Sequence, residues 1–192
     1  MAGGFWVDDF IGVGSGEGLN GSAKSVDEKY GITGLGEVKG VLGMLIERDH
    51  NTRSIYISQE AFINTVLACF NLSDAAPLST PMIPATRLSS ADCPTSQEEK
   101  DEIAHRPYRQ LVGALSWLAL GTRPDIAFAT TSLARFGNNP GVVHWEAAKR
   151  VLWCLKGTSG WRVRLGGDDP QVGAYTDADW GGDRDDRRSI GA

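Results

Sequence analysis

The stretch PYRQLVGALSWLALGTRPDIAFATTSLARFG, residues 107–137, decides the fold class of the second half of the chain. A proline suits the first turn of a helix, and Gly121 would end that helix. Three leucines recur at the spacing of one helical face: Leu111, Leu115 and Leu118. Pro124 opens a second helix, which we expect to close at Gly137. The stretch therefore predicts two consecutive helices, the first with an apolar face.

Two further helices are expected on either side of this stretch. One runs from about Val143 to Lys156 and ends at Gly157, because glycine commonly follows the last helical turn. The other follows Ser58, a good capping residue, and covers QEAFINTVLACF. Its apolar face is expected to hold Phe62, Val66, Cys69 and Phe70. Residues 73–105 contain four prolines among Ser, Thr and Asp, which predicts a long connector.

Strands are expected at both ends of the chain. Residues 5–8 and 10–13 are rich in β-branched and aromatic side chains and predict a hairpin, followed by a helix over about 19–32. Residues 40–58, GVLGMLIERDHNTRSIYIS, predict a strand, a polar turn and a strand. Two later segments are expected to open another sheet: WRVRL (161–165) and VGAYTDADW (172–180). This order of elements predicts an α+β fold.

The composition is that of a globular protein, with 41% apolar and 22% charged residues. No apolar run approaches the roughly 20 residues that cross a bilayer. The N-terminus lacks the plan of a signal peptide, so we expect an intracellular protein without membrane contact. The three cysteines do not have the spacing of zinc ligands and are interpreted as free thiols, with Cys69 and Cys154 on helical core faces.

Charge is distributed unevenly along the chain, whose formal net charge is −5. Residues 105–165 contain nine Lys or Arg and two acids, a local charge of +7, so the remainder carries −12. A basic block beside acidic clusters would suit a protein that handles a polyanion and has carboxylate metal sites. A set of solvated helix faces explains the same charges.

The dipeptide Asp8-Asp9 has two interpretations. A polar turn between apolar strands favours an ordinary hairpin, because Asp can bond its own backbone. Two carboxylates held at the edge of a sheet would also suit a divalent metal. The following GVGSGEG lacks the Lys-Ser/Thr pair of a phosphate-binding loop, so a nucleotide-binding regulator is a minor alternative.

Several other residues have mainly structural interpretations. His144 is expected near a helix cap, and Arg123 is expected to cap a helix or pair with Asp125. The acidic and basic turn near the C-terminus is expected to be solvated, with Arg187 and Arg188 as its nucleic-acid contacts. Four aromatic residues recur at helical spacing and are expected in the core, with base-stacking platforms as the minor alternative: Trp117, Phe128, Phe136 and Trp153.

Seven stretches, taken in order, match the motifs of one known family: WVDD, GEVKGVLGMLIERD, YISQEAF, STPM, YRQLVGALSWLALGTRPDIAFATTSLARF, NNPGVVHWEAAKRVLWCLKGT and YTDADWGGDRDDRRS. Together they resemble copia-type retrotransposon Pol polyproteins, from the end of the reverse transcriptase into the start of ribonuclease H. The resemblance covers essentially the whole chain after Gly4.

This resemblance implies three parts. Residues 1–58 would be the C-terminal part of the reverse transcriptase palm, with a palm-type hairpin and helix and then a primer-grip-like hairpin. Residues 59–165 would form the helical thumb and connection, with the proline-rich connector at 73–105. Residues 166–192 would be the truncated opening strands of a ribonuclease H-like sheet.

The resemblance also implies metal-binding residues. WVDD matches the palm hairpin whose aspartates bind two catalytic Mg²⁺ (or Mn²⁺) ions, with Asp8 as the main ligand and Asp9 as a supporting one. The ions would activate the primer 3′ hydroxyl and stabilise the leaving pyrophosphate. Trp6 stands beside this site where the family usually has tyrosine. YTDADW is similar to the first ribonuclease H strand, so Asp177 would be the first catalytic and metal-binding aspartate there.

The implied partner is an RNA/DNA template-primer. Gly43 in GVLGM would let the backbone come close to the primer terminus. Basic residues of the later helices would contact phosphates without reading the sequence. The expected nucleic-acid contacts are Trp6, Gly43, Arg123, Lys149, Arg150 and Lys156.

Both implied active sites are expected to be incomplete in this chain. The palm needs an upstream aspartate and the fingers, and ribonuclease H needs further carboxylates after Asp177. Half a ligand set cannot fix two metal ions, so the polypeptide alone is expected to be an inactive RNA-directed DNA polymerase unless another chain supplies the missing parts. The alternative is a non-catalytic nucleic-acid-binding protein that acts through the basic helices of residues 105–165.

Overall fold

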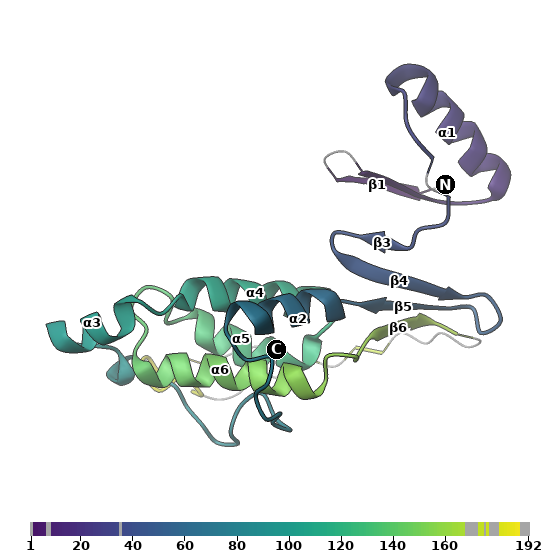
Figure 1. The fold of residues 1–192 in the computed structure, drawn as a ribbon. Coiled ribbons are helices and arrows are strands. Elements are labelled where there is room, and N and C mark those ends of the chain that lie inside the picture. The colour runs from purple at the N-terminus through teal and green to yellow at the C-terminus, as the bar shows by residue number, and fades with distance from the viewer. Residues whose placement is uncertain are drawn as a thin grey trace. The chain divides into compact units, whose positions relative to one another are not determined.

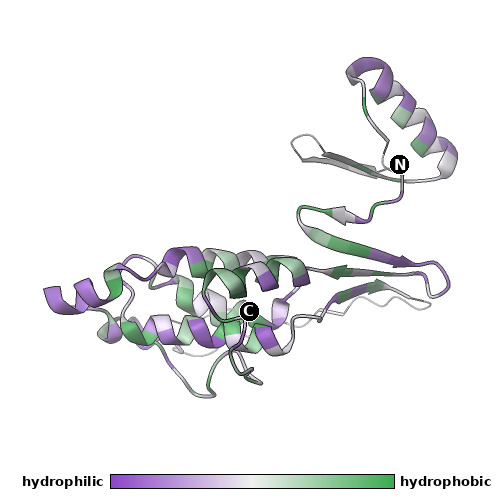
Figure 2. Ribbon diagram, in the orientation of Figure 1, coloured by the Kyte–Doolittle hydropathy of each residue, from purple (hydrophilic) through white to green (hydrophobic). Residues whose placement is uncertain are grey.

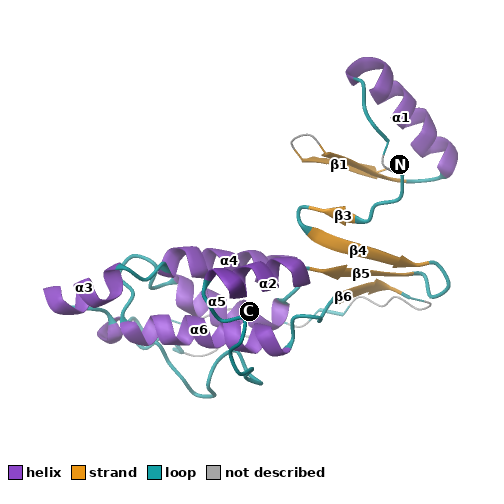
Figure 3. Cartoon of the chain, in the orientation of Figure 1, coloured by secondary structure: helices purple, strands orange, loops and turns teal. Residues whose placement is uncertain are grey.

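The computed structural model describes residues 2–6, 9–34, 36–167, 173–174, 176 and 181–188. The chain divides into two compact units, Met1–Val41 and Leu42–Ala192. Figure 1 shows the elements along the chain, and Figure 3 distinguishes helices from strands. The cluster of buried apolar side chains found among the described residues belongs to the second unit.

The first unit begins with an antiparallel hairpin, as predicted. β1 (Ala2–Trp6) pairs with β2 (Asp9–Val13), and Trp6 lies opposite Asp9. The expected bounds were wrong, because Asp9 is the first residue of β2 and not part of the turn. A connection of two residues is enough to reverse an antiparallel chain. Val7 and Asp8, which form that connection in the sequence, lie outside the described residues.

A helix and a short strand complete the first unit. α1 (Gly16–Tyr30) begins three residues before the expected start, where the Ser15 hydroxyl accepts a hydrogen bond from the Gly18 N–H. Gly31 ends the helix with a φ of 64°, a left-handed conformation that favours glycine. The unit ends with the two-residue strand β3 (Gly40–Val41).

The hairpin predicted for residues 40–58 is found in the second unit over residues 44–58, because residues 40–41 form the separate strand β3. β4 (Met44–Asp49) and β5 (Ser54–Ser58) pair in antiparallel register. The Asp49 carboxylate closes the turn by accepting the N–H of Asn51 at 2.9 Å and the hydroxyl of Thr52 at 2.7 Å. Aspartate favours such turns because its short side chain reaches the backbone two residues on.

The expectation that WRVRL opens a new sheet was wrong. Its residues form β6 (Val163–Gly166), which pairs antiparallel with β5 and extends the β4–β5 hairpin. Val163 lies opposite Ile57, and Leu165 lies opposite Ile55. Such cross-strand apolar pairs stabilise a sheet, whichever segment of the chain supplies the strand. Of the second expected strand, VGAYTDADW, only residues 173, 174 and 176 are described.

Helices make up most of the rest of the second unit: α2 (Glu60–Cys69), η1 (Ser90–Asp92), α3 (Gln97–Ala104), α4 (Tyr108–Gly121), η2 (Pro124–Ile126), α5 (Ala127–Ala134) and α6 (Val142–Gly157). The helices expected after residue 107 are confirmed, although α5 ends before Gly137. The connector expected at 73–105 contains a helix, α3, that sequence analysis missed. Its signal was local, because Ser96 and Glu99 exchange side-chain-to-backbone hydrogen bonds in a capping box.

The core of the second unit is built around α4. Leu111, Leu115 and Leu118 are completely buried, which confirms the predicted face. The packed cluster also includes apolar residues from the neighbouring helices: Ile63, Leu67, Ile126, Leu133, Val151, Leu152 and Leu155. Figure 2 shows the hydrophobic colouring on these helices and on the β4–β6 strands.

The N-terminal end and the buried face of α2 differ from the prediction. The N-cap residue is Gln59, although the Ser58 hydroxyl still accepts the Glu60 N–H at 3.2 Å. The buried residues are Ile63, Val66 and Leu67, which follow one another at helical spacing. Cys69 falls outside that face and is exposed, whereas Cys154 is buried as expected. All three cysteines are free thiols.

The aromatic residues expected in the core are mostly not buried. Phe136 is only 5% exposed, whereas Trp117 is 38% and Phe128 67% exposed, and Trp153 is half-buried. On α5 the buried face belongs to Ala129 and Leu133, so the periodicity places Phe128 on another side of the helix. Helical spacing alone did not show which side faces the core.

Gly141 and Gly113 provide a matched test of this packing. A Cβ at Gly141 would lie 2.0 Å from the Asp92 carbonyl oxygen, whereas one at Gly113 would meet nothing within 4 Å. We expect Gly141→Ala to lower the free energy of unfolding by about 2 kcal/mol or more. Gly113→Ala should raise it by up to about 1 kcal/mol, because alanine favours a helix interior. Chemical denaturation measures both, and equal stability of the two variants would contradict the packing described.

Candidate functional site

Asp9, the second residue of the acidic dipeptide, is the first residue of β2. Trp6 is the backbone partner of Asp9 in the β1–β2 register, while Asp8 and Asp177 lie outside the described residues. Within the described part of the chain, no group of three or more His, Cys, Asp or Glu side chains could hold a metal ion. The metal-binding roles of Asp8, Asp9 and Asp177 therefore stay predictions.

Gly43 occupies a tight turn immediately before β4. Leu42 and Gly43 have φ angles of 51° and 75°. Two consecutive positive φ values are typical of the type I′ turn, which favours glycine. A Cβ at Gly43 would meet no atom within 4 Å, so space is open beside this backbone. The predicted contact with a primer terminus is not tested by this geometry.

Arg123 is used inside the fold. Its side chain is 1% exposed, and Nε and Nη2 donate to the two carboxylate oxygens of Asp125 at 2.9 and 2.7 Å. Nη1 and Nη2 also donate to the carbonyl and hydroxyl oxygens of Thr158. The predicted pairing with Asp125 is confirmed. The guanidinium group thereby joins the start of η2 to the end of α6.

The basic residues of α6 differ in their surroundings. The Lys149 Nζ lies 2.8 Å from the Glu146 Oε2 and 5.7 Å from the centre of the Trp153 ring. Arg150 donates to the Thr80 hydroxyl at 3.0 Å and so holds the connector against the helix. Lys149, Trp153 and Lys156 recur at helical spacing, which places them on one side of α6. Lys149 and Lys156 are both partly exposed on this side of the helix.

Most of the basic block at 105–165 has intramolecular partners. The described residues supply an ion-pair or hydrogen-bond partner to eight of its nine cations: Arg106, Arg109, Arg123, Arg135, Lys149, Arg150, Arg162 and Arg164. Several of these contacts join segments far apart in the sequence. The local charge of +7 therefore overstates the positive charge that is free to meet a partner.

The terminal turn, residues 181–188, is held against the helices and is not simply solvated as expected. The Asp185 carboxylate accepts hydrogen bonds from the Ser89 hydroxyl at 2.7 Å and from the Ser90 N–H and hydroxyl at 2.9 and 2.8 Å. Arg135 contacts both Asp183 and Asp185. Asp183 is only 9% exposed. The hydrogen bonds from Ser89 and Ser90 hold the pKa of Asp185 below its usual value.

His144 has the structural role that was expected. It is fully buried at the start of α6, and its Nδ1 accepts the Gly141 N–H at 2.9 Å. Its ring stacks on Phe136 with the ring centres 4.0 Å apart. Burial is the main cause that lowers the pKa of His144, so the neutral form is favoured. Only a neutral Nδ1 can accept the Gly141 N–H.

Sequence analysis missed Ser89, Ser90, Arg135 and Asp185 as a cluster. Ser89 and Asp92 form a capping box, and the S-x-x-D pattern could have indicated that local turn. The contact of Asp185 with Ser90 spans 95 residues. No local pattern indicates such a pair.

The chain is similar to transposon polyproteins over nearly its whole length. It is 43% identical over 185 residues to the retrovirus-related Pol polyprotein from transposon TNT 1-94 of Nicotiana tabacum, covering 96% of this chain and 14% of that protein. It is 34% identical over 183 residues to the Pol polyprotein from transposon RE1 of Arabidopsis thaliana, covering 94% and 12%. The chain thus spans a small part of these relatives' length.

A shorter relative covers the same region. The chain is 30% identical over 186 residues to an uncharacterised mitochondrial protein of Arabidopsis thaliana, covering 96% of this chain and 73% of that protein. No protein-family profile matches the chain. No solved structure matches it either. Within the described residues, no helix is long and apolar enough to span a membrane.

Asp185→Asn tests the contact that holds the terminal turn. A carboxylate whose pKa is lowered on folding stabilises the protein above its unfolded-state pKa, about 3.9, and the effect is lost as the pH falls through the folded pKa. We expect the variant to have a lower Tm than the wild type at pH 7, with the two values converging below about pH 4. Thermal unfolding followed by circular dichroism measures this.

Asp186→Asn is the matched control, because Asp186 lies on the same turn and pairs with the exposed Arg188. Surface ion pairs contribute little, so its Tm should stay near that of the wild type. A Tm loss for Asp185→Asn that is independent of pH would contradict a role for the carboxylate charge.

Proposed function

Because the chain belongs to the family of copia-type retrotransposon Pol polyproteins, we propose that it is the part of Pol that runs from the reverse transcriptase palm into the start of ribonuclease H. By descent its chemistry would be RNA-directed DNA synthesis. The observation that supports this most directly is the β1–β2 hairpin, with Trp6 paired to Asp9 at its end. A hairpin of this kind would carry acidic residues at the tip of two rigid strands.

Divalent metal ions would supply the chemistry of this proposal by activating a nucleophilic hydroxyl and stabilising developing charge. Asp8 and Asp9 would be the ligands from this hairpin, and Asp177 would belong to the ribonuclease H part. Carboxylates are suitable ligands for Mg²⁺ or Mn²⁺. Two adjacent carboxylates leave most coordination positions to water, so we expect weak metal binding by residues 1–192 alone.

A primer-extension assay on the purified 192-residue polypeptide tests this expectation. We predict no Mg²⁺-dependent product on an RNA template, because one hairpin supplies too few ligands to fix two ions. Asp8→Asn should make no difference to this result. Robust extension that Asp8→Asn abolishes would overturn the expected inactivity and support the polymerase assignment.

Mn²⁺ titration followed by NMR examines the hairpin without requiring activity. Broadening of the Asp9–Val13 amide signals at millimolar Mn²⁺, lost in Asp8→Asn, is the expected result, since paramagnetic broadening is greatest near the ion. Asp27→Asn, at an acidic residue of α1, is a control that should leave the broadening unchanged. Uniform broadening over the first unit would count against a hairpin site.

A second candidate function is non-catalytic nucleic-acid binding through residues 105–165. It is favoured by the mitochondrial relative, because the aligned 186 residues, nearly the whole of this chain, cover 73% of that protein. Lys149 and Lys156, on one side of α6, would contact the phosphates, since Arg123 is buried and Arg150 holds the connector. Cations that track phosphates bind without reading sequence.

The double variant Lys149→Glu/Lys156→Glu tests this candidate by fluorescence anisotropy with a labelled single-stranded oligonucleotide. Each lost phosphate contact reduces the slope of log K against log salt, so we expect a slope shallower by about 1.4. Lys100→Glu on the exposed face of α3 is the matched control and should bind as the wild type does. Binding that is absent at low salt, or insensitive to the double variant, would refute the candidate.

A further inference from the structure

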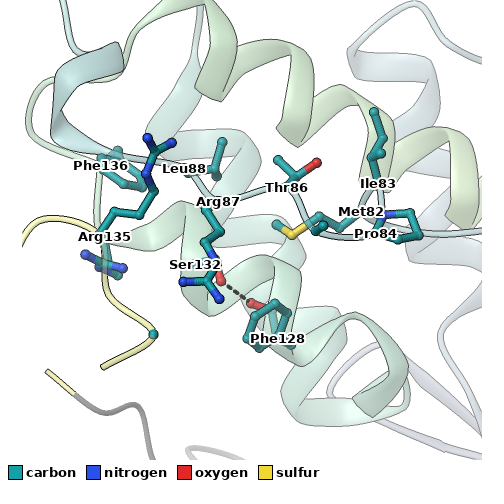
Figure 4. Close-up of a pocket in the computed structure, with 13 residues that line it drawn as sticks. Met82, Ile83, Pro84, Thr86, Arg87, Leu88, Phe128, Ser132, Arg135 and Phe136 are labelled. Atoms are coloured by element: carbon teal, nitrogen blue, oxygen red, sulfur yellow. Dashed lines mark hydrogen bonds between the residues drawn. The ribbon is translucent and has the colours of Figure 1, made fainter. Parts of the chain in front are cut away.

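An open pocket lies in the second unit, and its lining includes none of the residues expected to hold a metal or to contact the template-primer. It has a volume of about 340 Å³ and is bounded by the connector at residues 82–88, by α5 and by the terminal turn. Figure 4 shows Met82, Ile83 and Pro84 on the connector and Phe128 and Ser132 on α5. The three walls come from segments that are far apart in the sequence.

The charged residues that line the pocket are all cations. They are Arg87, Arg135 and Arg184, and none of the acidic residues that the structure describes lines it. Arg135 is already paired with Asp183 and Asp185. Among the described residues, Arg87 and Arg184 have no ion-pair or hydrogen-bond partner. Two guanidinium groups are therefore free to meet an anion in a chain whose net charge is −5.

Phe128 gives the pocket an exposed aromatic surface. The side chain is 67% exposed, which is unusual for phenylalanine. Figure 4 shows it one helical turn from Ser132, with the Arg87 side chain extending from the connector towards α5. The Ser132 hydroxyl donates to the Phe128 carbonyl oxygen at 2.8 Å, so it is held along the helix. An exposed aromatic side chain and two free cations thus line the same pocket.

We propose that this pocket binds an unpaired nucleotide of a single-stranded nucleic acid, with the base stacked on Phe128 and the phosphates near Arg87 and Arg184. Proteins that bind single-stranded nucleic acid without sequence preference combine aromatic side chains, on which bases stack, with cations that follow the phosphate backbone. A paired base would keep its face inside the duplex, out of reach of Phe128. The pocket is also large enough for a small ligand, since such sites begin at about 300 Å³.

This site rests on the proposed function only in that both require contact with nucleic acid. It uses Phe128, Arg87 and Arg184, whereas the second candidate function uses Lys149 and Lys156 on α6. An acidic peptide with an apolar anchor would meet the same cations, but it would gain little from a stacking surface. The two surfaces can therefore be tested separately on the same chain.

The experiment is fluorescence anisotropy of the full 192-residue chain with a labelled 12-nucleotide oligo(dT). Phe128→Ala should weaken binding about fivefold or more and leave the salt slope unchanged. Arg87→Ala and Arg184→Ala should each make the slope shallower by about 0.7. Unlabelled oligo(dT) should compete most strongly with the labelled strand, a duplex of the same length less strongly, and a glutamate-rich peptide least.

Matched control variants are available at exposed residues that do not line the pocket. Leu120→Ala removes an apolar side chain that is 85% exposed on α4, and Lys100→Ala removes an exposed cation of α3 that does not line the pocket. Both variants should bind oligo(dT) as the wild type does. Circular dichroism of each variant verifies that exposed substitutions have left the fold intact.

Three results would overturn the proposal that this pocket binds an unpaired nucleotide. Binding that Phe128→Ala leaves unchanged excludes stacking, and equal competition by duplex DNA excludes an unpaired base. Competition by the glutamate-rich peptide as strong as that by oligo(dT) assigns the site to acidic peptides. If Phe128→Ala has no effect while Lys149→Glu/Lys156→Glu abolishes binding, the oligonucleotide binds at the α6 surface and not in the pocket. If Phe128→Ala abolishes binding while the double variant has no effect, it binds in the pocket and not at α6. The polymerase assignment is judged independently by the Mn²⁺ titration.

Discussion

The leucine face of α4 is the constraint on which the second unit depends. Leu111, Leu115 and Leu118 are removed completely from solvent by side chains of α2, α5 and α6. Truncating such a buried leucine to alanine typically costs about 2–5 kcal/mol, a large part of the stability of a small domain. The neighbouring helices are held by this face, and the polar contacts of the unit are arranged around it.

Polar contacts then connect the irregular segments to the helices. Arg123 joins η2 to the end of α6, Arg150 holds the connector, and Asp185 attaches the terminal turn to Ser89 and Ser90. A cation that is buried or paired inside the fold has little charge left for a partner. This explains why the block at 105–165, so basic in the sequence, presents few free cations in the structure. Arg87 and Arg184 lie outside that block, and both line the pocket, the first from the connector and the second from the terminal turn.

Family membership and structure bear on function in different ways. The similarity to Pol polyproteins connects this chain to retrotransposons over nearly all of its residues. The structure describes the hairpin that would carry the acidic pair and, separately, the cations and exposed aromatic side chain of the second unit. Catalysis by two metals requires carboxylates held together, whereas binding a single strand requires only cations and a stacking surface. Binding is thus the function that we propose for the second unit by itself.

The sequence by itself determined the features that depend on residues three or four positions apart. The leucine spacing predicted α4, proline and glycine marked several helix ends, and ordered motifs identified the family. Tertiary structure alone decided that β6 pairs with β5, that Phe128 faces solvent and that Asp185 meets Ser89. The physical reason is range: helical periodicity is a local property, whereas the contact of Arg164 with Ser54 spans 110 residues. Such contacts form only once the core has brought distant segments together.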